Sequence, residues 1–241
     1  MKKQQVDHVL RAAGRITGER QFIIIGSQSL HGKHPDIADD ILRSFEVDLV
    51  AKRDPSRTEW LNTIGQDSKF HEQFGYYADP VDETTATLPK GWKGRLVNLP
   101  DGDTDGVRGL CLDPHDLAIA KYVACREKDV IFTRELVARR LVDPDRLNAL
   151  LDETPVSGEV RSRIRAHIAR DLGAQREQQP TVSEDSSSLE QIRAQGRQDW
   201  PKRGQSQSQE ASDPKLDRSP KRRGKHQLRD QGHEIDEESS E

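Results

Sequence analysis

The sequence predicts an α+β protein: a mixed sheet with flanking helices, followed by a helical C-terminal subdomain and a disordered charged tail. Three observations lead to this fold class. Apolar runs with strand-like and helix-like periods alternate through residues 1–112. Three stretches of helical period follow over residues 113–173, two of them opened by Asp-Pro. Apolar residues almost vanish over residues 174–241, so this segment cannot offset the entropy of ordering. These three ranges are the predicted domains.

The overall composition limits what the protein can be. Only 32% of the 241 residues are hydrophobic and 33% are charged, and the shortage of apolar residues falls on the tail. The net charge of −4 provides no general attraction for nucleic acid or anionic membrane. No apolar stretch approaches the length of a membrane span. We therefore expect a soluble, cytoplasmic protein without a membrane partner, whose Cys111 and Cys125 are reduced thiols.

The first elements follow from short apolar periods. Apolar residues at helical spacing precede Gly18, which predicts a helix that ends there. These residues are Val6, Val9, Leu10, Ala13 and Ile16. The apolar run over residues 22–25 predicts a buried strand that stops at Gly26. Residues 31–40 are polar and include a proline, which indicates a loop or a broken helix.

A second strand is predicted over "SFEVDLVAK", residues 44–52. Apolar side chains alternate there with Glu46 and Asp48, so one face is apolar and the other acidic. The apolar positions are Phe45, Val47 and Leu49. A short helix follows, with Asp54 or Ser56 as its cap.

Three more strands precede the helical part of the chain. The segment "FGYYADPV" predicts the third strand, and "GRLVNLP" and "VRGLCLD" predict the fourth and fifth. The turn sequence "DGDTDG" between the last two predicts a hairpin.

The helical part should contain three helices. One long helix is predicted over residues 113–141, with Asp113 as its N-cap and Pro114 at its first position. A second helix begins at Asp143 in the same way, and a third covers residues 157–172.

Glu46 and Asp48 stand two residues apart on the second strand, so both carboxylates leave one face, roughly 6–7 Å apart at Cα. Like charges this close repel one another. A Lys or Arg opposite them would give a structural pair, whereas a divalent cation such as Mg²⁺ between them would give a functional site. An acidic face that simply points to solvent is the third alternative, and the spacing alone leaves all three open.

The segment before the acidic strand suits a phosphate group. Gly26 lets the backbone approach a phosphate with no side chain in the way, and the Ser27 hydroxyl can hold a triphosphate. The order of strand, Gly-Ser and acid-x-acid strand resembles the nucleotidyltransferase superfamily related to DNA polymerase beta. The resemblance implies an NTP substrate, with Glu46 and Asp48 as catalytic ligands of Mg²⁺.

A longer resemblance covers roughly residues 5 to 155. The segments "FIIIGSQSLHG", "LRSFEVDLVAK" and "CLDPHDLAIAKYVACREKDVIF" are similar to a bacterial family of nucleotidyltransferase-like domains of unknown function, the DUF6036 group. That group is distantly related to AbiE-type toxins. The resemblance implies Lys121 and Asp129 as further catalytic residues, with Lys121 also binding nucleotide.

The same resemblance bears on partners. It implies an RNA, protein or small-molecule acceptor for the nucleotide, and a toxin-like role would imply an antitoxin partner. The alternative is a catalytically degenerate module of the same fold that binds nucleotide or a partner protein.

The predicted long helix supports a site at Lys121 independently. Lys121, Cys125 and Asp129 are spaced by four, which predicts one slanted stripe on the helix. Small residues leave open space around the lysine; they are Ala118, Ala120 and Ala124. The alternative is a surface Lys121 and an Asp129 that pairs with Arg126, three residues before it.

Two departures from the superfamily pattern concern the acids. Glu46 stands where the superfamily usually has Asp, and 18 residues separate it from Ser27, a longer gap than usual. The third carboxylate is Asp79 on the third strand, or else Asp101 or Asp103, which suit a turn better.

Other polar and aromatic residues have two interpretations each. Loop histidines His31 and His34 and the ring of Trp92 could contact a nucleotide, although exposed loop histidines and a tryptophan packed under a loop are more common. Tyr76 and Tyr77 point to opposite faces of their strand, so only one could line a site. The basic cluster "SPKRRGKH" in the tail either binds a partner loosely or is solvated.

Overall fold

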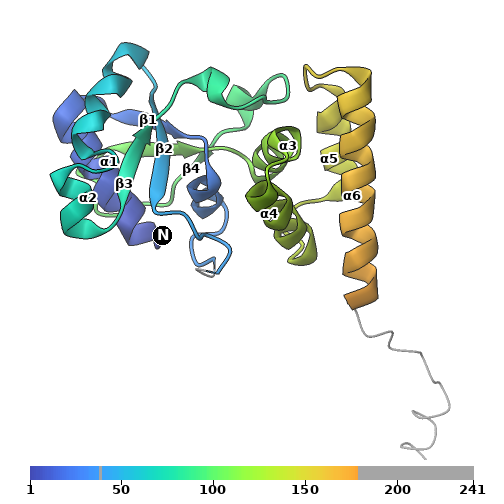
Figure 1. Ribbon diagram of the computed structural model, residues 1–241. Coiled ribbons are helices and arrows are strands. Elements are labelled where there is room, and N and C mark those ends of the chain that lie inside the picture. Colours follow the sequence, from blue (N-terminus) through green and yellow to red (C-terminus); the bar gives the residue numbers. More distant parts are fainter. Residues whose placement is uncertain (38–39, 179–241) are drawn as a thin grey trace, which may run out of the picture. The chain divides into compact units, whose positions relative to one another are not determined.

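The computed structural model describes residues 1–37 and 40–178, which belong to one compact unit. Five strands form one mixed sheet in the order β3-β2-β1-β5-β4 (Figure 1). The strands are β1 (Gln21–Ile24), β2 (Glu46–Ala51), β3 (Tyr77–Pro80), β4 (Val97–Asn98) and β5 (Arg108–Cys111). The central strand β1 pairs antiparallel with β2 and parallel with β5. The predicted α+β class is confirmed.

Every predicted strand is present, and the predicted hairpin is the antiparallel pair β4–β5. The alternation in β2 also holds, because Val47 and Leu49 are fully buried. The prediction for Phe45 was wrong. This residue lies just before the strand begins, and 64% of its surface is exposed.

The described residues also form six α-helices and four 3₁₀ helices. The α-helices are α1 (Lys3–Thr17), α2 (Lys69–Phe74), α3 (Pro114–Ala124), α4 (Glu127–Ala138), α5 (Pro144–Asp152) and α6 (Gly158–Gln178). The 3₁₀ helices are η1 (Ser27–Gly32), η2 (Pro55–Ile64), η3 (Glu83–Thr85) and η4 (Trp92–Arg95). None of the helices within residues 1–37 and 40–178 is both long enough and apolar enough to cross a bilayer.

The ends of several helices follow their sequence signals. Gly18 ends α1 in a left-handed conformation, with φ of 71°. The side chains of Asp54, Asp113 and Asp143 cap η2, α3 and α5 by accepting hydrogen bonds from backbone amides. Helix α6 continues to Gln178, past residue 172, where the third helix was predicted to end, and the remainder of the predicted tail lies outside the described residues.

The sheet separates two apolar cores. Phe22 and Ile24 of β1 point into the core covered by α1 and η2, whereas Ile23 points into the other. That second core is built with side chains of α3, α4, α5 and α6, including Leu117 and Leu136. These helices therefore share one core with this face of the sheet, with α5 and α6 packed against α3 and α4, and the predicted boundary after residue 112 falls between β5 and α3.

The prediction of one continuous helix over residues 113–141 was wrong. Cys125 adopts a left-handed conformation with φ of 51° and ends α3, and Arg126 is the N-cap residue of α4. The Asp129 side chain accepts a hydrogen bond from the backbone N–H of Arg126 at 3.2 Å, so it caps the new helix. Local helix propensity continues through this segment, and the cap overrides it.

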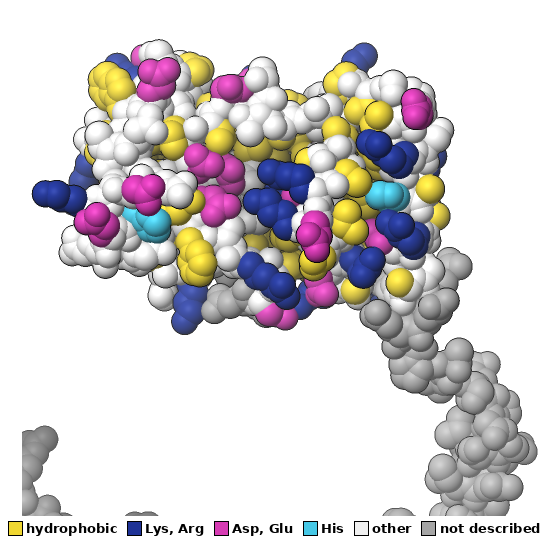
Figure 2. All heavy atoms as spheres, in the orientation of Figure 1, with side chains coloured by type: hydrophobic (Ala, Val, Ile, Leu, Met, Phe, Trp, Pro, Cys, Tyr) yellow, Lys and Arg dark blue, Asp and Glu magenta, His cyan; other side chains and the backbone are white. Residues whose placement is uncertain are grey.

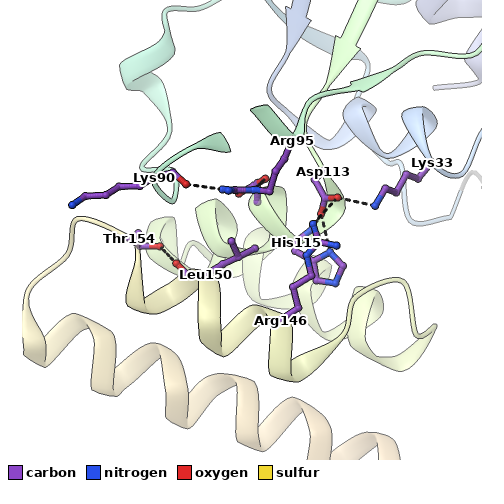
Figure 3. A network of polar contacts seen from close by, with 9 residues as sticks. Lys33, Lys90, Arg95, Asp113, His115, Arg146, Leu150 and Thr154 are labelled. Carbon is purple, nitrogen blue, oxygen red and sulfur yellow. Dashed lines mark hydrogen bonds and ion pairs between the residues drawn. The ribbon is translucent and has the colours of Figure 1, made fainter. Parts of the chain in front are cut away.

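The buried carboxylate of Asp113 links the start of α3 to the segment after η1 and to α5. Asp113 accepts hydrogen bonds from Lys33 Nζ at 2.7 Å, His115 Nδ1 at 2.8 Å and Arg146 Nη2 at 3.3 Å (Figure 3). His115 Nε2 accepts from the backbone N–H of Asp143 at 2.8 Å, so the ring proton is on Nδ1. Burial alone would raise the pKa of Asp113, but the hydrogen bonds from His115 and Lys33 hold it well below its usual range.

Replacing Asp113 with alanine should lower the free energy of unfolding by about 3 kcal/mol at pH 7, because three polar partners lose a buried acceptor. The lowered pKa means that this contribution is present above about pH 4 and is lost as the pH falls through the folded-state value. Urea unfolding of both proteins should therefore show a difference that shrinks below pH 4. Asp152→Ala, which removes an exposed ion pair with Arg165, is the control and should cost under about 1 kcal/mol.

Candidate active site

A cavity of about 580 Å³ lies where the sheet meets α3 and α4. The six residues that the family resemblance assigns to catalysis or nucleotide binding line it: Gly26, Ser27, Glu46, Asp48, Lys121 and Asp129. In Figure 2, carboxylate side chains (magenta) and Lys and Arg side chains (dark blue) face each other across a hollow in the middle of this view. The cavity is thus bounded by an acidic wall from the sheet and a cationic wall from the helices.

The acidic wall consists of Glu46, Asp48 and Asp79. β2 and β3 run parallel with Asp48 directly opposite Asp79, and Glu46 lies on the same face of β2 as Asp48. Burial is the main cause that raises the pKa of Asp48 to about 6, and the charges of Asp79 and Glu46 raise it further, while Lys121 opposes them. Burial and then the charge of Glu46 also raise the pKa of Asp79. This wall holds more negative charge than its surroundings neutralise.

The structure distinguishes the three candidates for the third carboxylate. Asp79 lines the cavity beside the predicted pair. Asp101 and Asp103 belong to the loop between β4 and β5, where Asp103 forms an ion pair with Arg11 of α1. Of the three, Asp79 therefore has the position that a third site carboxylate requires.

Gly26 is needed because the Asp48 side chain occupies the space beside it. A Cβ atom placed on Gly26 would come within 1.7 Å of Asp48 Oδ2 and 2.6 Å of its Cγ. The backbone N–H of Ile25 also donates to the Asp48 carbonyl at 3.1 Å, which fixes the two strands at this point. The missing side chain of Gly26 thus leaves room for the Asp48 carboxylate, a role that the sequence did not reveal.

Ser27 opens η1, and its hydroxyl lies 2.9 Å from the hydroxyl of Ser44. Gln28 Nε2 donates to the same Ser44 oxygen at 2.9 Å. The long segment between Ser27 and Glu46 therefore returns to the loop at Ser44, one residue before the exposed Phe45. Ser44 also lines the cavity and was not predicted, because a single serine before the acidic strand carries no specific signal.

The cationic wall consists of Lys121, Arg126 and Lys128. Lys121 Nζ lies 3.4 Å from Asp129 Oδ1, and Arg126 Nε lies 2.7 Å from Asp129 Oδ2. Burial would raise the pKa of Asp129, but these partners, Arg126 before Lys121, lower it below its usual value. The predicted pairing of Asp129 with Arg126 is therefore present, and Lys121 shares the same carboxylate. The predicted stripe was wrong for Cys125, whose Sγ lies 3.9 Å from His167 Nδ1 of α6.

The remaining nucleotide-binding candidates do not line the cavity. His31 is buried, with Nε2 3.1 Å from the Met1 carbonyl and Nδ1 3.3 Å from the Pro35 carbonyl. Trp92 packs against the second core, and the Tyr76 hydroxyl lies 2.8 Å from His8 Nδ1. These residues have structural partners of their own.

The acidic wall suits a hard divalent cation in its donor chemistry. Carboxylate oxygens are the protein ligands that Mg²⁺ prefers, and Mg²⁺ is commonly held by one or two of them together with substrate phosphates. In the part of the chain that the structure describes, no three His, Cys, Asp or Glu side chains converge closely enough to hold an ion by themselves. The acids of the wall repel one another, and the raised pKa of Asp48 fits a site that receives its cation together with phosphate.

Gly26→Ala should displace the Asp48 carboxylate and destabilise the fold by about 1–3 kcal/mol, because the added Cβ overlaps it. Thermal unfolding measures the change. Gly94→Ala is the matched control, since a Cβ on that glycine meets nothing within 4 Å, and it should change stability by under about 0.5 kcal/mol. Equal stability of the two variants would contradict the overlap.

Asp48→Asn should stabilise the protein by about 2 kcal/mol at pH 8. The folded-state pKa of about 6 lies above the unfolded value, so the stability that protonated Asp48 provides is lost as the pH rises through 6. Urea unfolding at pH 4, 6 and 8 should show the advantage of the variant grow with pH. A variant less stable than the parent protein at pH 8 would contradict the burial of this charge, and Asp101→Asn serves as the exposed control.

Comparison with known proteins identifies the family. A family model described as a nucleotidyltransferase of unknown function (DUF6036) matches residues 4–177, which include both walls of the cavity. Searches of curated proteins and of solved structures returned no match. The more distant relation to AbiE-type toxins stays a prediction. The chain belongs to the DUF6036 family of nucleotidyltransferases of unknown function.

Proposed function

We propose that the cavity binds an NTP and catalyses Mg²⁺-dependent transfer of its nucleoside monophosphate to an acceptor hydroxyl. The observation that carries this proposal is the pairing of two opposite walls in one cavity: Glu46, Asp48 and Asp79 face Lys121 and Arg126. A ligand that suits both walls must present a cation to one and anions to the other. A nucleoside triphosphate with its metal has this character, and membership of a nucleotidyltransferase family supports it.

The proposed reaction is a substitution at the α-phosphorus. The acceptor oxygen forms a bond to the α-phosphorus, and the bond from that phosphorus to the oxygen bridging the β-phosphate breaks, so pyrophosphate leaves. The acceptor proton passes to Asp79, the carboxylate of the wall that is not assigned to Mg²⁺, and burial and the charge of Glu46 raise its pKa toward the range of a general base. Glu46 and Asp48 would hold Mg²⁺, which supplies charge neutralisation at the phosphate oxygens.

The chain's other cavity residues bind and orient the substrate. Gly26 gives the Asp48 carboxylate its place, and the Ser27 hydroxyl binds a phosphate oxygen after exchanging its bond with Ser44. Lys121, held at the cavity by Asp129, neutralises charge on the phosphates. The acceptor is an RNA, a protein or a small molecule.

A degenerate binding module is the second candidate. Two contacts favour it: the Ser27 hydroxyl is hydrogen-bonded to that of Ser44, and Lys121 forms an ion pair with Asp129. Both groups therefore already have partners within the chain. This candidate predicts NTP binding without turnover. A toxin role with an antitoxin partner is a further proposal, which growth inhibition on expression would test.

Incubation with each α-labelled NTP, Mg²⁺ and cell extract should transfer label to an acceptor. Glu46→Ala and Asp48→Ala should each reduce transfer by about 100-fold or more, because each removes a metal ligand. Asp101→Ala, an acidic residue outside the cavity, is the control and should retain full transfer. Labelling that survives both cavity changes would overturn the site, and NTP binding with no transfer by any variant would favour the binding module.

A further inference from the structure

Arg126 stands at the junction between α3 and α4 and lines the cavity, although sequence analysis considered it only as a structural partner of Asp129. Its side chain is 58% exposed, whereas that of Asp129 is 2% exposed. The guanidinium also interacts electrostatically with Asp48 across the cavity. An exposed cation that is held by a buried acid and faces the acidic wall has the position of a ligand-binding group.

The contacts of Arg126 with Asp129 fix the plane of the guanidinium and use one edge of it. Nε donates to Oδ2 at 2.7 Å and Nη2 donates to Oδ1 at 3.3 Å. Among residues 1–37 and 40–178, Nη1 donates no hydrogen bond to the protein. A guanidinium held by one edge presents its other edge in a set orientation, which suits the paired oxygens of a phosphate.

The charge balance of the helical side points to an anion. Asp129 carries one negative charge and contacts two cations, Lys121 and Arg126, so this trio has a net positive charge. Lys121 is a point charge that is 19% exposed, whereas Arg126 can make two parallel hydrogen bonds. The single positive charge of Lys121 neutralises only part of the negative charge of a triphosphate. Arg126 adds a second positive charge on the same side of the cavity.

We propose that Arg126 is a second phosphate-binding residue, which Asp129 orients and whose free edge binds the terminal phosphates of the NTP. This inference rests on the proposed function. It makes Asp129 a positioning residue that serves two cations at once. The acidic wall, with its metal, then receives the phosphate next to the nucleoside, and Arg126 receives the phosphates that leave.

Isothermal titration calorimetry of the full chain with each NTP, the matching NMP and inorganic tripolyphosphate, all with Mg²⁺, tests this assignment. Arg126→Gln should weaken NTP and tripolyphosphate binding by about 10-fold and change NMP binding by less than about 2-fold, because NMP lacks the terminal phosphates. Arg126→Lys should fall between, since it retains the charge and loses the parallel hydrogen bonds. Arg163→Gln is the matched control: this exposed arginine of α6 lies outside the cavity, so the change should leave all three affinities unchanged.

The outcomes separate the two proposals. A parent protein that binds neither NTP nor tripolyphosphate overturns the proposed function and this inference with it. A parent protein that binds NTP while Arg126→Gln binds it equally well overturns the inference alone. Equal weakening for NTP and NMP would show that Arg126 acts only by supporting the fold, and Arg126→Lys keeps the test decisive if the glutamine variant unfolds.

Discussion

The break between α3 and α4 is the constraint on which the arrangement of charges depends. On one continuous helix, residues eight positions apart are separated by about 12 Å along the axis. The left-handed turn at Cys125 instead lets Lys121 and Asp129 approach to 3.4 Å. A non-glycine residue in this conformation costs about 1 kcal/mol, which the cap on Arg126 and two ion pairs offset. Without the break, Asp129 would be a buried charge with fewer partners, which is strongly destabilising.

In the acidic wall, the unfavourable term is repulsion between like charges. Three carboxylates gathered by β2 and β3 repel one another, and the raised pKa of Asp48 reflects its burial first and this repulsion second. Nothing in the packing of the sheet requires an acid at this position, and Gly26 gives up a side chain to make room for it. Unfavourable local energy that a neighbouring residue accommodates is typical of sites kept for function, since a purely structural strand would be more stable without it.

Much of the fold and the membership of the site could be predicted from the sequence, because both depend on local patterns. Alternation revealed β2, and capping residues such as Asp113 and Asp143 marked where helices begin. The helix break was missed because Cys125 and Arg126 carry no strong local stop signal. The position of Asp79 opposite Asp48 and the link between Ser27 and Ser44 depend on strand register and chain return, which one sequence does not encode locally.

The order of strands in the sheet also sets an order of folding. β1, β2 and β3 come from the first 80 residues, whereas β1 must wait for β5, about 90 residues further along, to gain its second neighbour. Closing so long a loop to form a parallel pair is slow compared with local contacts. Because the N-terminus leaves the ribosome first during synthesis, the three acidic residues of the wall emerge well before Lys121. The residues of the acidic wall are therefore made before the cation that faces them, and the later helices supply both the second core and the neutralising charge.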